Sequence, residues 1–369
     1  MQNVECVLPC FDACPLFSPG GLRGTGRSYT VGEGTVEKMK QQFMAGAALL
    51  FLLFGSVWVQ TPPDAILDDP APEVQEPKTA MRDEELMLRV WDGEAVREMT
   101  MAEYLPGVVR GEMPASFETE ALKAQAAAER TYACYRLLHG GKSAHPDADV
   151  CMSSACCSAW MSEAAAAERW GERAAEYEAR IRQAVQDTDG QVVLYEGAPI
   201  LAAFHAASAG STASGAEVWK SDLPYLASVK SPESVDEVPN YYSVNTFSAE
   251  EFRRKIAAAY PSAALEGPLE SWLGDAELTA SGRVASLTVG GVPVPGTALR
   301  KLLGLRSTAF TAAAAGDSIV FRVTGYGHGV GMSQYGANVL AQEGKSWQEI
   351  LCWYYTGASV GFFTPTVQS

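Results

Sequence analysis

A carboxylate on an otherwise apolar helix face is the first candidate for chemistry. Leu105, Val108, Val109 and Glu112 follow 3–4 spacing, which places them on one side of a helix. A carboxyl group among apolar side chains is either paired with a cation or kept protonated by desolvation. A protonated carboxyl that faces a cleft can act as a general acid. The alternative is a buried ion pair with one of three nearby cations, Arg110, Lys123 and Arg130.

A histidine and two cysteines, His145, Cys151 and Cys157, recur at intervals of six residues. One imidazole and two thiolates suit a tetrahedral Zn²⁺ ion. A disulfide and free buried thiols are the alternatives, although the adjacent Cys156 and Cys157 have poor geometry for bridging each other. Three protein ligands leave a fourth position, as in catalytic zinc, but no His-Glu-x-x-His motif is present. Thiolate ligands in a Ser- and Ala-rich loop favour structural zinc, and we expect Cys156 to matter less than Cys157.

Two loops carry small and polar residues that suit binding of a polymer. Residues 204–212 run from a predicted strand into a hydroxyl-rich loop, although a turn with capping hydroxyls would have the same composition. Residues 325–337 contain a G-x-G-x-G-x-G run around His328, which fits neither the dinucleotide nor the P-loop pattern. The remaining His139 ends a predicted helix. The predicted binding residues of the two loops are His205, Ser208, Gly210, Thr212, His328, Ser333, Gln334 and Tyr335.

The chain has 369 residues and a net charge of −16, so sequence-independent binding to nucleic acid is not expected. An uncharged run at residues 43–59 follows Lys38 and Lys40 and precedes several aspartates. This pattern predicts a single transmembrane helix within residues 39–60, with the chain after Gln60 outside the cell. A cleaved signal peptide and a buried core helix are the alternatives. Residues 1–38 contain three cysteines without a fourth ligand nearby, and they are predicted to be a cytoplasmic or non-native extension.

The remainder of the chain predicts an α+β fold, in which helices pack with antiparallel sheets and hairpins. Residues 61–83 are rich in Pro, Asp and Glu and predict a linker. A hairpin should turn at Asp92-Gly93, and Thr100 with Glu103 should open a helix that is kinked or restarted at Pro106. Further helices are predicted from Ser116 to His139, 162–186, 248–259, 297–303 and 347–355. Strands are predicted at 191–195, 200–205, 284–289, 292–294 and 318–323.

The motifs together resemble the stage II sporulation protein D family. The resemblance rests on segments 104–114, 121–126, 130–133, 205–212, 303–307 and 327–337, with Ile350, Leu351, Tyr354 and Tyr355 closing it. Two departures are visible: Cys156-Cys157-Ser158 stands where members often have His-Cys-Gln, and Glu129 interrupts a usually apolar run. The matching part implies one extracytoplasmic catalytic domain over residues 84–369.

The resemblance implies a lytic transglycosylase that cuts peptidoglycan glycan strands, often strands without stem peptides, during sporulation and engulfment. In this family the Glu of the Gly-Glu-Met-Pro motif is the acid/base, which here is Glu112. Some members bind zinc through one His and two Cys, matching His145, Cys151 and Cys157. Implied partners are an amidase, stage II sporulation protein P, and a membrane protein, stage II sporulation protein M. The resemblance also covers non-catalytic amidase enhancers, and a zinc hydrolase of peptide or acetyl groups is a more distant alternative.

Overall fold

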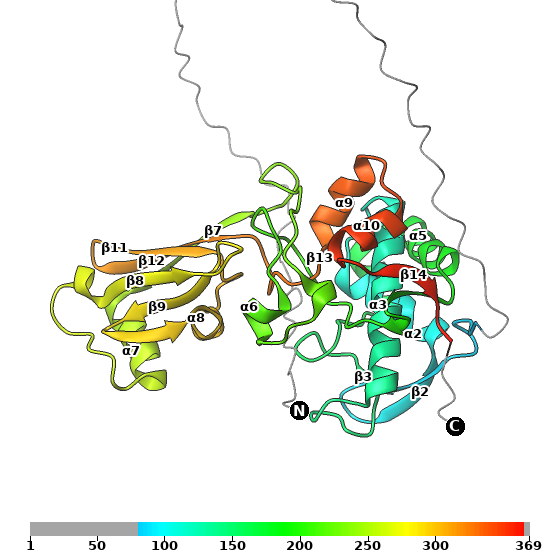
Figure 1. Cartoon of the computed structure of the whole chain (residues 1–369), viewed down its shortest axis with the longest axis horizontal. Coiled ribbons are helices and arrows are strands. Elements are labelled where there is room, and N and C mark those ends of the chain that lie inside the picture. The colour runs from blue at the N-terminus through cyan, green and yellow to red at the C-terminus, as the bar shows by residue number, and fades with distance from the viewer. Residues whose placement is uncertain (1–79, 365–369) are drawn as a thin grey trace, which may run out of the picture. The chain divides into compact units, whose positions relative to one another are not determined.

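A computed structural model describes residues 80–364. The described chain is a mixed α+β structure with several small sheets, most of them antiparallel (Figure 1). The predicted membrane helix at 39–60 and extension at 1–38 lie outside the described residues. Within residues 80–364, no helix is both long and apolar enough to cross a membrane.

The helix α2 carries the candidate acid Glu112, and α3 packs against it. The hairpin of β1 (Met87–Trp91) and β2 (Val96–Thr100) leads directly into α2 (Met101–Glu112). The Thr100 hydroxyl accepts a hydrogen bond from the Glu103 amide, and the Glu103 carboxylate accepts one from the Thr100 amide. This pair confirms the predicted capping box. The helix α2 is unbroken through Pro106, so the predicted alternative of a helix that restarts at this residue was wrong. The helix α3 spans Thr119–His139 and ends at Gly140.

Two sequence-based helix boundaries were wrong. Ser116 does not cap α3, because Phe117 N–H bonds back to the Pro114 carbonyl in a turn and the helix begins only after Glu118. The predicted helix at 162–186 is divided into α4 (Glu163–Trp170), the 3₁₀ turn η1 (Gly171–Arg173) and α5 (Ala174–Asp187). Gly171 has φ +56°, a left-handed conformation that ends α4.

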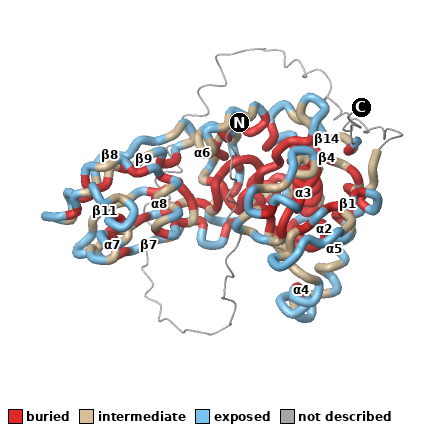
Figure 2. The backbone as a smooth tube through the Cα atoms, turned by 90° about the horizontal axis from the view of Figure 1, so that it is seen from below, coloured by how far each residue is buried: buried red, intermediate tan, exposed pale blue. Residues whose placement is uncertain are grey.

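Small strands surround these helices. They are β3 (Val150–Cys151), β4 (Gln191–Tyr195), β5 (Ala198–Pro199), β6 (Phe204–His205), β13 (Met332–Ser333) and β14 (Ser359–Phe362). The strand predicted over 200–205 is thus only the two-residue β6, which pairs in parallel with β13. The remaining helices of this group are α6 (Gly215–Trp219), the 3₁₀ turn η2 (Pro224–Leu226), α9 (Gln334–Gln342) and α10 (Trp347–Tyr354). A large hydrophobic core joins them, and α3 is buried along most of its length (Figure 2).

A second hydrophobic core forms between residues 247 and 323. Its elements are β7 (Tyr242–Ser248), α7 (Ala249–Ala259), the 3₁₀ turn η3 (Leu269–Trp272), β8 (Leu273–Leu278), β9 (Val284–Val289), β10 (Val292–Pro295), α8 (Gly296–Leu303), β11 (Phe310–Ala315) and β12 (Ser318–Thr324). Ser248 caps α7, and β9 and β10 form the predicted hairpin at Gly290-Gly291. The predictions at both places are confirmed.

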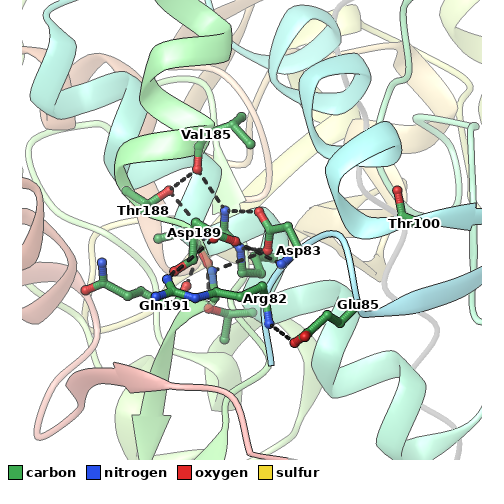
Figure 3. A network of polar contacts seen from close by, with 12 residues as sticks. Arg82, Asp83, Glu85, Thr100, Val185, Thr188, Asp189 and Gln191 are labelled. Carbon is green, nitrogen blue, oxygen red and sulfur yellow. Dashed lines mark hydrogen bonds and ion pairs between the residues drawn. The ribbon is translucent and has the colours of Figure 1, made fainter. Parts of the chain in front are cut away.

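A buried ion pair fixes the start of the described chain to α3 (Figure 3). Both Asp83 carboxylate oxygens accept from Arg130, at 2.6 and 2.7 Å. Arg130 also donates to the Thr188 hydroxyl and to the main-chain carbonyls of Val185 and Gln191. Because these contacts satisfy the guanidinium almost completely, the buried charge is compensated.

Candidate functional site

Glu112 occupies the last position of α2, and its side chain is only 2% exposed. Leu105, Val108 and Val109 are fully buried on the same helix, which confirms the predicted apolar face. The expected alternative was an ion pair with a nearby cation. Each of the three candidate cations binds a different carboxylate: Arg110 binds Glu178, Lys123 binds Glu120 and Asp187, and Arg130 binds Asp83.

Two glycines one helical turn apart let a loop cross α2 at Glu112. A Cβ at Gly107 would overlap the Trp160 indole, and a Cβ at Gly111 would overlap the Ala159 carbonyl. The Met161 amide donates to the Gly107 carbonyl at 2.9 Å. This close approach brings the Ala159 amide to the Glu112 carboxyl, to which it donates a short hydrogen bond.

An open cavity of about 210 Å³ lies at this end of α2. Glu112 lines it together with two half-buried aromatic residues, Trp170 and Tyr177, whose rings meet edge to face at 5.6 Å between centroids. Arg169, also in the lining, is exposed and makes no ion pair within residues 80–364. A carboxyl group, aromatic faces and a cation in one cavity suit an anionic sugar. Sequence reasoning missed these three lining residues because an amphipathic Ala-, Arg- and Glu-rich helix gives no signal of a site.

The predicted metal ligands lie together, and the structure adds a fourth. The donor atoms of His145, Cys151, Cys156 and Cys157 all lie within 4.8 Å of one another. The His145 Nε2 atom lies 3.4 Å from the Cys157 sulfur, while its Nδ1 faces the Ala148 carbonyl at 3.2 Å. Zn–N of about 2.0 Å and Zn–S of about 2.3 Å in a tetrahedron place N and S about 3.5 Å apart. The distance between His145 Nε2 and the Cys157 sulfur therefore matches a tetrahedral site that the four donors could form. The Ala148 carbonyl orients the imidazole with Nε2 toward the cysteines.

The electrostatics of this cluster favour a thiolate at its centre. The thiols of Cys151 and Cys156 donate to the Cys157 sulfur and lower the pKa of the Cys157 thiol far below its usual range. The same contacts and burial raise the pKa of Cys151 and of Cys156. Thiolate is the form that binds a metal. The sequence-based expectation that Cys156 matters less than Cys157 rested on spacing alone. In the structure, the Cys156 side chain lies in the same cluster as the other three.

Three of the eight predicted binding residues cluster around a different buried group, Glu233. The Glu233 carboxylate accepts from the Ser208 amide at 2.6 Å and from the Ser333 hydroxyl. His205 Nε2 lies 2.8 Å from the Ser208 hydroxyl, and its other ring nitrogen faces the Val330 carbonyl. The parallel pairing of β6 with β13 places His205 opposite Ser333. Glu233 lies in a loop without a recognisable motif, so sequence reasoning did not identify it.

His328 lies beside this group, with its ring centroid 5.7 Å from that of His205 and 5.1 Å from that of Trp219. Its Nδ1 accepts from the Val330 amide at 3.1 Å, whereas its buried Nε2 has no hydrogen-bond partner within residues 80–364. Burial, followed by the charge of Arg300, lowers the pKa of His328 to about 3. Burial, followed by the charge of His328, also lowers the pKa of His205 well below its usual range. Both imidazoles are therefore neutral at neutral pH.

The remaining predicted binding residues divide by exposure. Thr212 is buried and holds the Val229 main chain through its hydroxyl. Gln334 is buried too, and its amide donates to the Glu112 main-chain carbonyl at 3.0 Å. Gly210 is exposed and Tyr335 is half buried. Of the two predicted loops, the glycine loop thus reaches Glu112 through Gln334.

The chain resembles known proteins over most of its described length. The family model SpoIID, stage II sporulation protein, matches residues 92–195. The stage II sporulation protein D of Bacillus subtilis is 35% identical over 270 residues, which are 72% of this chain and 76% of that protein. The chain belongs to the stage II sporulation protein D family. The protein of the same name from Bacillus amyloliquefaciens is 35% identical over 266 residues, 72% of this chain and 75% of that protein.

The chain is also similar to a protein with a different name. The amidase enhancer of Bacillus subtilis is 27% identical over 308 residues, which are 69% of this chain and 40% of that protein. Within the stage II sporulation protein D family match at 92–195 lie both Glu112 and the four-residue His/Cys cluster. The Glu233 group and the glycine loop lie beyond that segment. The family membership is thus confirmed.

Proposed function

We propose that the chain is a membrane-anchored lytic transglycosylase that cleaves peptidoglycan glycan strands, preferentially strands without stem peptides, during sporulation and engulfment. The observation that carries the proposal is Glu112, a nearly buried carboxyl that lines an open cavity together with aromatic side chains. Desolvation favours the protonated form of a carboxyl group, which a glycosidic leaving group requires.

The proposed reaction needs one acid/base and no added water. Glu112 gives its proton to the glycosidic oxygen as the bond from C1 to that oxygen breaks. The resulting carboxylate takes the proton of the same sugar's 6-hydroxyl, whose oxygen closes onto C1 and forms an anhydro ring. Ordinary glycoside hydrolysis instead requires a second carboxyl group to act on water or on the sugar. The Ala159 amide would stabilise the carboxylate between the two proton transfers.

The cavity gives the proposed substrate a place to bind. Trp170 and Tyr177 offer aromatic faces for sugar rings, and Arg169 offers a charge for the lactyl carboxylate that a muramyl residue exposes when its stem peptide is removed. Gly210 and Tyr335 have exposed surface for contacts farther along the strand. The buried His205, Ser208, Thr212, His328, Ser333 and Gln334 would then support the loops that present this surface.

We further propose that the His/Cys cluster binds structural Zn²⁺. His145, Cys151, Cys156 and Cys157 supply four ligands, so no coordination position is left for a substrate. The ion would fix the loop whose next residues cross α2 and hold Glu112.

The anchor and the partners remain proposals from the sequence. A helix within residues 39–60 would hold the domain at the outer face of the cell membrane. Its partners there would be an amidase, stage II sporulation protein P, and a membrane protein, stage II sporulation protein M. A protease added outside intact cells should then digest the chain beyond Gln60. Protection of the whole chain from that protease would exclude this placement.

Product analysis tests the reaction. Purified protein and wall glycan without stem peptides should give fragments with anhydro ends by mass spectrometry, whereas water-added ends would mean hydrolysis. The second candidate is a non-catalytic amidase enhancer, favoured by the 27% identity to a protein of that name. An enhancer would leave the glycan intact and increase release of stem peptides by an added amidase.

A further inference from the structure

A second buried carboxyl group lies next to Glu112. Glu129 is on α3 and is 1% exposed. Its two oxygens accept from the Gln125 amide at 3.2 Å and from the Ser158 hydroxyl at 2.9 Å. Both partners are neutral, and Glu129 makes no ion pair in the described part of the chain. Burial of a carboxylate without a cation lowers the stability of the fold, so a role for Glu129 beyond stability is expected.

The two carboxyl groups are held by consecutive residues of one loop. Ser158 donates its hydroxyl to Glu129, and Ala159 donates its amide to Glu112. A displacement of this loop at one carboxyl group therefore moves the donor at the other. Gly107 and Gly111 confine the loop against α2, so little movement is available to it.

Two glutamines make a second connection. Gln334 donates to the main-chain carbonyl of Glu112 at 3.0 Å and to the Gln125 side-chain oxygen at 3.4 Å. Gln125 in turn donates to Glu129 at 3.2 Å. These contacts join α2, α3 and the first residue of α9. Glu129 is thus linked to the Glu112 side chain through Ser158 and Ala159, and to the Glu112 main-chain carbonyl through the two glutamines.

The charges of the two groups act on each other as well. Burial, followed by the charge of Glu112, raises the pKa of Glu129 well above its usual range. Cys157 and two buried tyrosines, Tyr104 and Tyr355, also interact electrostatically with Glu129. No ion pair joins Glu129 to a cation within residues 80–364. Two close carboxyl groups in such surroundings favour sharing one proton.

We infer that Glu129 is a positioning residue for Glu112, because it fixes the Ser158-Ala159 segment and the two glutamines that hold Glu112. Glu129 is not among the residues that line the cavity, so it would not contact a glycan bound there. The inference rests on the proposed role of Glu112 and extends it. It also gives a role to the one charged residue in a run of alanines on α3.

The test compares three variants of the full chain. Glu129→Gln keeps the size of the side chain and removes its charge. Ser158→Ala removes one hydrogen bond and keeps both carboxyl groups. Glu251→Gln, on the exposed side of α7, serves as the control for loss of a surface carboxylate. Circular dichroism and thermal unfolding establish that each variant is folded before its activity is compared.

With denuded glycan as substrate, Glu129→Gln should lower kcat at pH 7 about tenfold and leave KM within about twofold. The alkaline limb of its kcat–pH profile should move down by about one pH unit, because tenfold in proton affinity corresponds to one pH unit. Ser158→Ala should lower kcat about threefold to tenfold, the effect of one hydrogen bond, without moving the limb. A folded Glu129→Gln protein with wild-type kcat and pH profile would overturn the inference.

A spectroscopic readout separates this inference from the proposed function. Infrared titration of the protonated-carboxyl band does not depend on turnover. The buried carboxyl group that ionises last should do so at lower pH in Glu129→Gln than in wild type. If wild-type protein cleaves no glycan, the proposed function fails while this shift still supports the coupling of the two groups. An unchanged titration in the folded variant contradicts the coupling whatever the activity.

Discussion

The Gly111 Cα faces the Ala159 main-chain carbonyl so closely that no side chain fits between them. The contact sets where the Ala159 amide stands, and that amide holds the Glu112 carboxyl. Glycine at position 111 is therefore required by the close approach of the loop and not by the helix.

Gly111→Ala should accordingly reverse the usual effect of this substitution. In an exposed helix interior, alanine is about 1 kcal/mol more stabilising than glycine. Here the added Cβ must push the loop away, and overpacking of this kind costs about 1–3 kcal/mol. We expect a lower melting temperature and loss of glycan cleavage. A variant that melts higher than wild type and cleaves normally would show that the loop does not rest on Gly111.

Glu112→Gln should abolish turnover and preserve the fold. The amide oxygen can still accept from Ala159, whereas the side chain can no longer transfer a proton. General acid–base catalysis is worth roughly 10²–10⁴-fold, so kcat should fall by at least about that much. Glycan binding, measured by co-sedimentation, should persist. Near wild-type cleavage by the folded variant would refute the assignment, and aggregation would instead indicate a structural role.

Trp170→Ala should weaken substrate binding more than it slows the chemical step. The half-buried indole lines the cavity beside Glu112 and carries no group that could transfer the proton. Loss of one aromatic stacking partner should raise KM about threefold to tenfold, with kcat changed less. Trp353→Ala, on the exposed side of α10, is the matched control. Equal effects of the two substitutions would argue against a sugar subsite at Trp170.

Cys156→Ser should lose metal as Cys151→Ser does. The sulfur of Cys156 lies within the four-donor cluster, so its removal leaves three ligands. Elemental analysis should find about one zinc per wild-type chain and less in both variants, with a lower melting temperature because metal binding contributes to folding. Cys352→Ser, at an exposed cysteine, should change neither quantity. Full zinc content in Cys156→Ser would instead support a site with three protein ligands, His145, Cys151 and Cys157.

His328→Gln should make the protein less sensitive to acid. An unfolded histidine binds a proton below about pH 6.5, whereas folding lowers the pKa of His328 to about 3. The unfolded chain therefore binds one more proton between these values, and stability falls as pH falls through that window. Each such group contributes up to about 1.4 kcal/mol per pH unit.

Urea unfolding at pH 7, 6 and 5 measures that slope. The free energy of unfolding of His328→Gln should depend less on pH than that of wild type, where His205 adds a second contribution of the same sign. His139→Gln, at the exposed end of α3, is the control. Parallel slopes for wild type and His328→Gln would show that this imidazole accepts its proton without cost in the folded state.

Local signals in the sequence predicted local structure well. The capping box at Thr100, the hairpins at Asp92-Gly93 and Gly290-Gly291, and the apolar face around Glu112 depend on neighbours within four residues. The same holds for the mixed α+β class. Ligand type and six-residue spacing predicted the candidate metal ligands His145, Cys151 and Cys157, which the structure brings together.

Contacts between distant segments account for what was missed. Glu118 is the N-cap of α3, and its amide donates to the Asn338 side chain, 220 residues away. The predicted N-cap, Ser116, was therefore wrong. The roles of Glu233, Glu129 and Cys156 likewise arise only when separate segments meet. Such positions carry no periodic pattern, so a single sequence cannot distinguish them from other buried polar residues.

The first and last described residues meet each other in the fold. The Met81 amide donates to the Phe363 carbonyl at 3.0 Å, and β14 pairs with β4 just before that point. A fold closed in this way has its two ends at one place, so a short peptide could join them and the chain could be opened at an exposed turn such as 92–95. The order of segments along the gene is thus separable from the arrangement that holds Glu112, and circular permutation becomes a practical route to a version of the domain with freely chosen termini.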